Sequence, residues 1–405
     1  MQPIKFAQIS DLHLEARLST SGLQFTQTQA EQRRAEVRQT LVQFVETARK
    51  EQVDLVLLPG DLTDTPVPSP ETVNFLIDTL NQLHPIPTLI APGNHDCASA
   101  ASFYNPASVL YRSRGAAAPT WGEHIYIFRG ENYETVQPLP DRSLTVTGCA
   151  FTEHVSRTSN WLSKVPAPAG DVSILLIHGS LLGQSPTPHD EPQVAPFTAE
   201  DLANLGYTYV ALGHYHSMSL VRSAGRIVGA YAGSPVALAL NATGPKGFII
   251  GCVVPGQPLK QEDLRLVPAD CRQIRPVALD VTGLSHQTAF EMALEKALTT
   301  SGASPADIVV MRLTGRHPPG VRFRVPERLR KVFWHTVIAD ETWPDYDLQL
   351  EAPIPAGPAV DVADCFRRRM QQIFQSATSD EEREVIREAY IYGCDALTLG
   401  KVTLR

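Results

Sequence analysis

The chain has 405 residues and a formal net charge of −8, from 35 Lys and Arg against 43 Asp and Glu. This acidic balance excludes a wholesale basic coat for nucleic acid, although a local basic patch remains compatible with it. Hydrophobic residues make up 43% of the chain and charged residues 19%, which excludes a mainly disordered protein. At about 150 residues per domain, this length predicts two or three domains.

The sequence also bears on the compartment. It contains no run of about 18 apolar residues that would span a membrane, and its start, MQPIKFAQIS, lacks the features of a signal peptide. The six cysteines lie far apart without a CxxC pair, which argues against a disulfide framework and against a thiolate zinc site. We therefore expect a cytoplasmic protein with no membrane partner.

Short apolar runs that end abruptly in polar residues characterise residues 1–250. Runs of this length without helical spacing predict buried strands. Between the first two runs, Glu31–Lys50 carries apolar residues at helical spacing, which predicts an amphipathic helix. Strands that alternate with helices predict an α/β layered domain, whose ligands gather beyond the strand ends. The five runs are Ile4–Ile9, Val53–Leu58, Ile86–Ala91, Val172–Ile177 and Tyr207–Leu212.

A smaller domain is predicted after Pro268, where the composition of the chain changes. A strand, a helix and a second strand are expected at Val277–Val281, Thr288–Thr300 and Ile308–Leu313, which together indicate a small α+β unit. Beyond a Pro-rich linker, Asp361–Leu399 carries spaced apolar residues and is predicted to be helical. We therefore expect a catalytic domain, a small α+β capping domain and a helical C-terminal segment at residues 1–268, 269–355 and 356–405.

Polar residues at the ends of the predicted strands are the candidates for chemistry. Five of the twelve histidines lie there, and no cysteine joins them. Carboxylate, imidazole and amide oxygen ligands without thiolate are typical of Mn²⁺, Fe or Zn²⁺ rather than of structural zinc. These ligands outnumber the needs of one metal, so two divalent ions that share a carboxylate are expected. The candidates are Asp11, His13, Asp61, Asn94, His95, Asp96, His178, His214 and His216.

Each of these motifs is weak alone, because a DxH or a GD at a strand end is more often a capped turn than a site. Their ordered succession is specific: DLH, GD, GNHD, H and GHYH each follow an apolar run. In DLH and GHYH, the spacing of two residues places both ligands on one face of an extended segment. Over residues 4 to about 250, this succession resembles the calcineurin-like metallophosphoesterase family.

The resemblance implies a four-layer α/β sandwich, in which helices flank two β-sheets, with a dinuclear metal site. Mn²⁺ is the metal we expect, with Fe and Zn²⁺ as alternatives. A hydroxide activated by the two metals would be the nucleophile. The resemblance places one metal on Asp11, His13 and His216, the second on Asn94, His178 and His214, and the bridge between them on Asp61.

The resemblance also assigns the two remaining candidates. His95 would be the catalytic histidine, which contacts the phosphate and protonates the leaving group. Asp96 would orient His95. No covalent phospho-enzyme is implied.

The later part of the chain resembles one branch of this family, the SbcD-type DNA repair nucleases and in particular their YhaO-like bacterial members. The features in common are the helix after the first motif, the segments GHYH, AGSP and NATGPKGF, and a small capping domain. This resemblance implies exonuclease or endonuclease activity on DNA and an SbcC-like ATPase as partner. A homodimer is a further alternative.

The motif GDLTD leaves a second substrate class open. Nucleases of this branch commonly carry an aromatic residue and then a histidine where this chain has Thr63 and Asp64. GDLTD is equally typical of cyclic-nucleotide phosphodiesterases of the wider family. The alternative activity is thus that of a cyclic-nucleotide or other small-molecule phosphodiesterase with an accessory domain. A scaffold with a degenerate metal site is a third reading, and the presence of every expected ligand argues against it.

The densest basic segment is Arg312–Lys331, in which Glu327 is the single acid. A charge run of this kind is usually a solvated face, and that interpretation stays open beside a track for DNA phosphates. Phe323 among the arginines fits the second interpretation. His154 and His189 lie in polar segments and are expected to be solvent histidines. The candidate DNA contacts are Arg312, Arg316, Arg322, Arg324 and Arg328.

Overall fold

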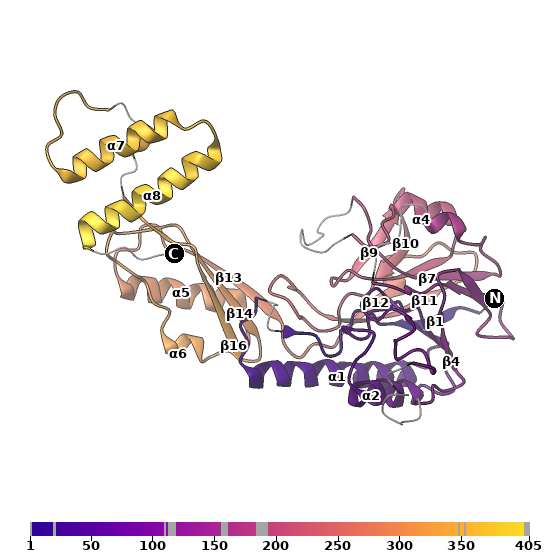
Figure 1. The fold of residues 1–405 in the computed structure, drawn as a ribbon. Helices are drawn as coiled ribbons and strands as arrows, with labels where there is room; N and C mark the ends of the chain where they lie inside the picture. Colours follow the sequence, from indigo (N-terminus) through magenta and orange to yellow (C-terminus); the bar gives the residue numbers. More distant parts are fainter. Residues whose placement is uncertain are drawn as a thin grey trace. The chain divides into compact units, whose positions relative to one another are not determined.

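The chain forms two compact units, Met1–Ile274 and Arg275–Arg405, each described by itself (Figure 1). Part of the Pro-rich segment before Pro196, with His189, lies outside the residues that the structure describes. The computed structural model describes residues 2–18, 22–108, 111, 119–154, 161–183, 193–346, 349–351 and 354–400.

Two six-stranded sheets form the first unit, with strand orders β12-β11-β1-β2-β3-β4 and β5-β6-β7-β8-β10-β9. The first sheet contains β1 (Ile4–Gln8), β2 (Leu55–Leu58), β3 (Thr88–Ile90), β4 (Ile125–Ile127), β11 (Gly247–Val253) and β12 (Leu264–Pro268). The second contains β5 (Glu134–Val136), β6 (Leu144–Gly148), β7 (Val172–His178), β8 (Tyr209–Gly213), β9 (Ser219–Ser223) and β10 (Arg226–Tyr231). The helices of this unit are α1 (Gln27–Lys50), α2 (Pro70–Asn81) and α4 (Ala199–Leu205).

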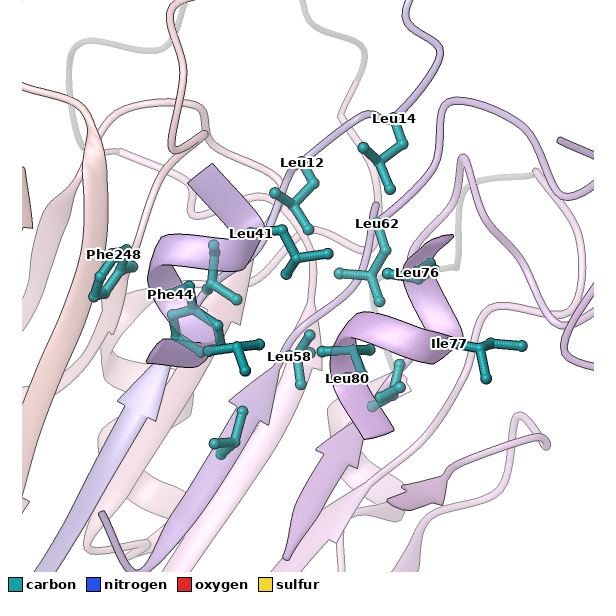
Figure 2. Close-up of a cluster of buried hydrophobic side chains, with 14 of the residues drawn as sticks. Leu12, Leu14, Leu41, Phe44, Leu58, Leu62, Leu76, Ile77, Leu80 and Phe248 are labelled. Atoms are coloured by element: carbon teal, nitrogen blue, oxygen red, sulfur yellow. The ribbon is translucent and has the colours of Figure 1, made fainter. Parts of the chain in front are cut away.

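The layers follow from the alternation of side chains along each strand. In β2, Leu55 and Leu57 lie in a core that residues of both sheets share, whereas Leu58 joins a core beneath α1 and α2 (Figure 2). On the far side of the second sheet, Leu202 of α4 packs into a third core with residues of β7 and β8. Helices thus flank two packed sheets, and the predicted four-layer α/β sandwich is confirmed.

The helix predicted from Glu31 begins four residues earlier, because a capping box fixes its start. The Thr26 hydroxyl accepts from the Gln29 backbone N–H at 3.3 Å, and the Gln29 side chain accepts from the Thr26 N–H at 3.0 Å. These two bonds satisfy backbone donors that the first helical turn leaves unpaired.

A buried ion pair ties α1 to the segment after β12. Arg33 is fully buried, and its guanidinium donates to the two carboxylate oxygens of Asp270 at 2.7 and 2.5 Å. It also donates to the Ala237 carbonyl oxygen at 3.0 Å. Burial opposes the charge of Arg33, but Asp270 and Glu36 outweigh burial and raise its pKa above the usual value. The bidentate geometry makes this a strong, directional contact.

Replacement of Arg33 by Met is expected to lower the free energy of unfolding by about 3–5 kcal/mol, because it leaves the Asp270 carboxylate buried without its partner. Urea denaturation followed by circular dichroism measures the loss. Arg34→Met on the same helix is the matched control, with an expected change within about 0.5 kcal/mol. Equal losses in the two variants would contradict a specific role for the buried pair.

The second unit is built on a three-stranded sheet of order β13-β14-β16, in which β14 pairs parallel to β16. The expected strand, helix and strand are confirmed as β13 (Ile274–Asp280), α5 (Gln287–Ser301) and β14 (Ile308–Thr314). The remaining elements are β15 (Arg316–His317), α6 (Glu327–Arg330), β16 (His335–Asp340), β17 (Trp343–Pro344), α7 (Val362–Ser376) and α8 (Asp380–Leu399).

The helical prediction for the C-terminal segment is confirmed as two helices, α7 and α8, because a new N-cap at Ser379 begins α8. Phe366 of α7 stacks on Tyr390 of α8, with ring centroids 5.5 Å apart. A separate domain beginning at residue 356 stays a prediction. Among the described residues, no helix is both long and apolar enough to cross a membrane.

Candidate metal centre

The predicted metal ligands follow the ends of five strands, β1, β2 and β3 in the first sheet and β7 and β8 in the second. Neighbouring strands in each group run parallel, so their polar ends meet at one edge of the sheet. The backbone is unusual there, with φ of 53° at Asp11, 43° at His13, 53° at Asp61 and 114° at His214. Residues other than glycine adopt such angles rarely, and this strain concentrates at functional sites.

Three acceptor atoms converge around His178. Its Nδ1 lies 2.8 Å from the carbonyl oxygen of Pro59, which can only accept, so Nδ1 carries the proton. In the neutral ring, the lone pair of Nε2 then faces Asn94 Oδ1 at 3.0 Å and Asp61 Oδ2 at 3.2 Å. A nitrogen lone pair and two oxygens at these distances are a suitable set of ligands for a cation.

His13 repeats this arrangement on the other side of Asp61. Its Nδ1 lies 3.0 Å from Asp64 Oδ1, so the carboxylate holds the proton on Nδ1. The opposite nitrogen, Nε2, lies 3.1 Å from His216 Nε2 and 3.7 Å from Asp61 Oδ2. Asp11, His13 and His216 offer ligand atoms that all lie within 4.8 Å of one another.

Asp61 lies between the two groups. The same oxygen, Oδ2, is the one closest to His13 and to His178, while Oδ1 accepts from the His95 backbone N–H at 2.9 Å. Asp11, Asp61 and His178 form a further group with ligand atoms within 4.8 Å. This geometry fits a carboxylate that serves two ions.

His214 supplies an independent test of whether a metal fits. Its Nε2 is buried, yet it has no hydrogen-bond partner among the described residues. Its backbone N–H donates to Asp11 Oδ1 at 2.9 Å, which links the second sheet to the first. A buried polar atom without a partner requires an explanation. A metal ion coordinated by Nε2 provides one.

The electrostatics of the site also favour cations. Burial opposes protonation of His178, but Asp61 outweighs burial and raises the pKa of His178 to about 9. Burial likewise disfavours charge on His13, while the hydrogen bond with Asp64 and the charge of Asp61 raise its pKa to about 9. The carboxylates thus draw positive charge into the site, and bound divalent ions would take the place of these protons.

Two glycines permit the close approach of the loops that carry the ligands. A Cβ on Gly93 would collide with Asp61 Oδ1, and a Cβ on Gly213 would collide with the carbonyl oxygen of Pro59. Any larger residue at either position would therefore displace a loop that holds a ligand.

The structure gives Asp96 a different task from the predicted one of orienting His95. Its carboxylate is fully buried and accepts from the backbone N–H groups of Asp61, Leu62 and Gly93 at 3.1, 2.8 and 2.7 Å. It also accepts from the Tyr104 hydroxyl at 2.8 Å. Asp96 therefore ties together the loops after β2 and β3, rather than contacting the imidazole of its neighbour.

Two residues that the sequence did not nominate surround His95. Asp64 Oδ1 lies 3.6 Å from His95 Nδ1, and the His154 ring lies edge-on to the His95 ring with centroids 5.1 Å apart. Asp64 was visible in GDLTD as a departure from the nuclease pattern, whereas His154 was expected to be a solvent histidine. Burial, against the charge of Asp61, lowers the pKa of His95, so the imidazole is neutral at neutral pH.

A buried lysine supports His216. Lys246 is 4% exposed, and its ammonium group donates to the His216 carbonyl oxygen at 2.5 Å. Lys246 belongs to the segment NATGPKGF, directly before β11. The end of the catalytic unit thus fixes the backbone of a ligand that follows β8.

The predicted DNA-contacting arginines fall into two groups in the second unit. Arg312 pairs with Glu341 at 2.9 Å, and Arg328 pairs with Glu291 at 2.7 Å and with Glu295 at 2.5 Å. The acids come from outside the basic segment, which is why the sequence of that segment showed Glu327 alone. Charges paired in this way are less available for phosphate.

The other three arginines remain exposed, and no ion pair of theirs occurs within the described part of the chain; they are Arg316, Arg322 and Arg324. Phe323 between them stacks on Phe290 of α5, with ring planes 6° apart and centroids 4.9 Å apart. Phe323 therefore belongs to the core of the second unit and anchors the segment, so it is not free to stack on a base.

A family model for calcineurin-like phosphoesterases matches residues 4–218, which include every predicted metal ligand. The chain belongs to this family. It is thus a metallophosphoesterase, and its ligand clusters match the dinuclear metal site that the family uses.

This phosphoesterase is 28% identical over 242 residues to the DNA double-strand break repair protein Mre11 of Saccharolobus solfataricus, covering 57% of this chain and 54% of that protein. It is 27% identical over 259 residues to the uncharacterized metallophosphoesterase YhaO of Bacillus subtilis, covering 62% and 57%. A segment of 59 residues is 42% identical to one of the polypeptides of the nuclease SbcCD of Staphylococcus epidermidis, covering 14% and 16%. The chain spans little more than half the length of the first two relatives.

Proposed function

We propose that this phosphoesterase is a DNA repair nuclease that hydrolyses phosphodiester bonds with two divalent metal ions. The observation that carries the proposal is the complete set of ligands on both sides of Asp61 Oδ2, 3.7 Å from His13 Nε2 and 3.2 Å from His178 Nε2. The names of the relatives, a double-strand break repair protein and a component of a nuclease, support DNA as the substrate.

The residues of the site divide the work. Asp11, His13 and His216 would hold one ion, Asn94, His178 and His214 the other, and Asp61 both. When bound, the two ions supply charge neutralisation at the phosphate and activation of water. Because the ligands are nitrogen and oxygen atoms without thiolate, Mn²⁺ is the metal we propose.

His95 is suited to contact the phosphate and to protonate the leaving oxygen. Its side chain is 37% exposed, so it can reach a substrate that enters from solvent. Its backbone N–H supports Asp61, which leaves the imidazole free for the substrate. A positioned imidazole of this kind acts as a general acid.

The second unit supplies the proposed partner surface and DNA contacts. The helices α7 and α8 expose apolar side chains, with Val362 71% and Val385 66% exposed. We place the SbcC-like ATPase on these helices. The exposed arginines Arg316, Arg322 and Arg324 are the proposed DNA phosphate contacts.

One observation favours a small phosphodiesterase as the second candidate. Asp64, the residue that distinguishes GDLTD from the nuclease pattern, contacts both His13 and His95. Substrate choice is tested by Mn²⁺-dependent turnover of linear DNA, bis-(p-nitrophenyl) phosphate and a cyclic nucleotide. Turnover of DNA supports the nuclease. Turnover of the cyclic nucleotide without DNA cleavage would favour the second candidate.

Replacement of Arg316, Arg322 and Arg324 by Ala is expected to weaken DNA binding and to flatten its salt dependence. Each phosphate contact contributes about −0.9 to the slope of log K against log salt, so three contacts contribute about −2.7. Binding titrations over a range of salt concentrations measure the slope.

The ion-paired residues of the same segment provide the control for this experiment. Arg312→Ala with Arg328→Ala removes two charges that are already neutralised, and a smaller change in slope is expected. Hydrolysis of bis-(p-nitrophenyl) phosphate should persist in both variants, because it depends on the metal site. An unchanged slope in the triple variant would show that the segment is only a solvated face.

A further inference from the structure

The segment after β6 is hydrogen-bonded along the loop that carries Asn94 and His95. The Phe151 N–H donates to the Pro92 carbonyl oxygen at 3.0 Å, and the Ala98 N–H donates to the Phe151 carbonyl oxygen at 2.7 Å. Further along the same segment, His154 Nδ1 lies 2.7 Å from the Asn94 carbonyl oxygen. A segment from the second sheet therefore clamps the loop after β3, which belongs to the first sheet.

The contact made by His154 defines its ring. A carbonyl oxygen can only accept, so Nδ1 must carry the hydrogen and donate it to Asn94. The bond is short and is made to the peptide unit that joins Asn94 to His95. The ring then lies edge-on to the His95 ring, at 5.1 Å between centroids and 87° between planes.

One side chain thus reaches both neighbours in the loop. Through the carbonyl group, His154 fixes the backbone from which the Asn94 amide extends toward His178. Through its ring, it limits the positions open to the His95 imidazole. His13 packs against another part of the same ring, with centroids 4.8 Å apart, so His95 is held between two histidines.

We propose that His154 is a positioning residue of the active site, which holds the Asn94–His95 peptide and the His95 ring in the geometry needed for phosphoester hydrolysis. This inference rests on the proposed role of His95. It assigns function to a residue that lies in none of the strand-end motifs and for which sequence reasoning expected no role.

Two substitutions separate the two contacts of His154. His154→Phe keeps an aromatic ring beside His95 and removes the donor to Asn94. His154→Asn removes the ring and keeps an amide N–H near the position of Nδ1. The matched control is His84→Phe, because exposed His84 forms a similar edge-on pair with His124, with centroids 5.4 Å apart, away from the metal ligands.

The full chain is loaded with Mn²⁺ and assayed with bis-(p-nitrophenyl) phosphate, so that the result does not depend on DNA binding. We expect His154→Phe to lower kcat by about 10- to 100-fold with little change in KM, the usual cost of losing a residue that orients a site. His154→Asn should recover most of kcat, His84→Phe should match the parent, and metal content should stay constant throughout.

A normal kcat in His154→Phe would overturn the proposal, and so would a loss of kcat in His154→Asn equal to that in His154→Phe. The double variant with His95→Gln distinguishes this failure from a failure of the proposed function. If His154 acts through its neighbour, the double variant is little slower than His95→Gln alone. A full rate in His95→Gln itself would instead refute the role proposed for His95.

Discussion

Replacement of Asp61 by Asn is expected to remove at least one metal ion and nearly all phosphoesterase activity. Asp61 Oδ2 is the carboxylate oxygen that lies close to both His13 and His178. The amide has no net charge, so both ions would lose the negative charge that they share. Elemental analysis of the purified variant, with turnover of bis-(p-nitrophenyl) phosphate, measures both effects.

The control for this variant is Asp78→Asn, at an exposed position on α2. It makes the same chemical change away from the site and should keep both metals and full activity. If Asp61→Asn retained two ions per chain, Asp61 could not be the bridge, and the assignment of the two metal positions would have to be revised.

Replacement of His95 by Gln is expected to lower kcat on the order of a hundredfold or more, which is the scale of a positioned general acid. Both metals should remain, because residue 95 supports Asp61 through its backbone N–H rather than through its ring. Steady-state kinetics and elemental analysis of the same preparation check the two statements together.

The metal content of this variant decides between two assignments for His95. His13, Asp64 and His95 themselves form a group whose ligand atoms lie within 4.8 Å of one another. Loss of a metal along with the rate would therefore make His95 a ligand, and the general acid would have to be sought elsewhere. Retention of both metals with a reduced kcat supports the proposed role.

The buried strands could be predicted from the sequence, whereas the edge strands could not. β2 and β7 have every residue buried, so their sequences are continuous apolar runs. β9, with the sequence SLVRS, lies at the edge of the second sheet and is largely open to solvent. Such a strand carries no apolar run and cannot be distinguished from a loop by composition.

The same limit explains which site residues were found. The ligands follow predicted strands, so their position in the sequence identified them as candidates. His154 follows β6, which the sequence did not predict, and it therefore did not stand out as a polar strand end. Asp96 was misinterpreted because it adjoins His95 in the sequence, although its carboxylate lies among the backbone N–H groups of other loops.

The position of β1 has a consequence for biosynthesis. β1 lies between β2 and β11, and it pairs with β11 in the register Ile4↔Val253. At about 5–20 residues per second, a ribosome needs about 10–40 s to add the roughly 200 residues between His13 and His216. During that time β1 lacks one neighbour, and its open edge can pair with other nascent chains. The metal site can be assembled only when most of the first unit has emerged, so metal loading comes late in synthesis or after it.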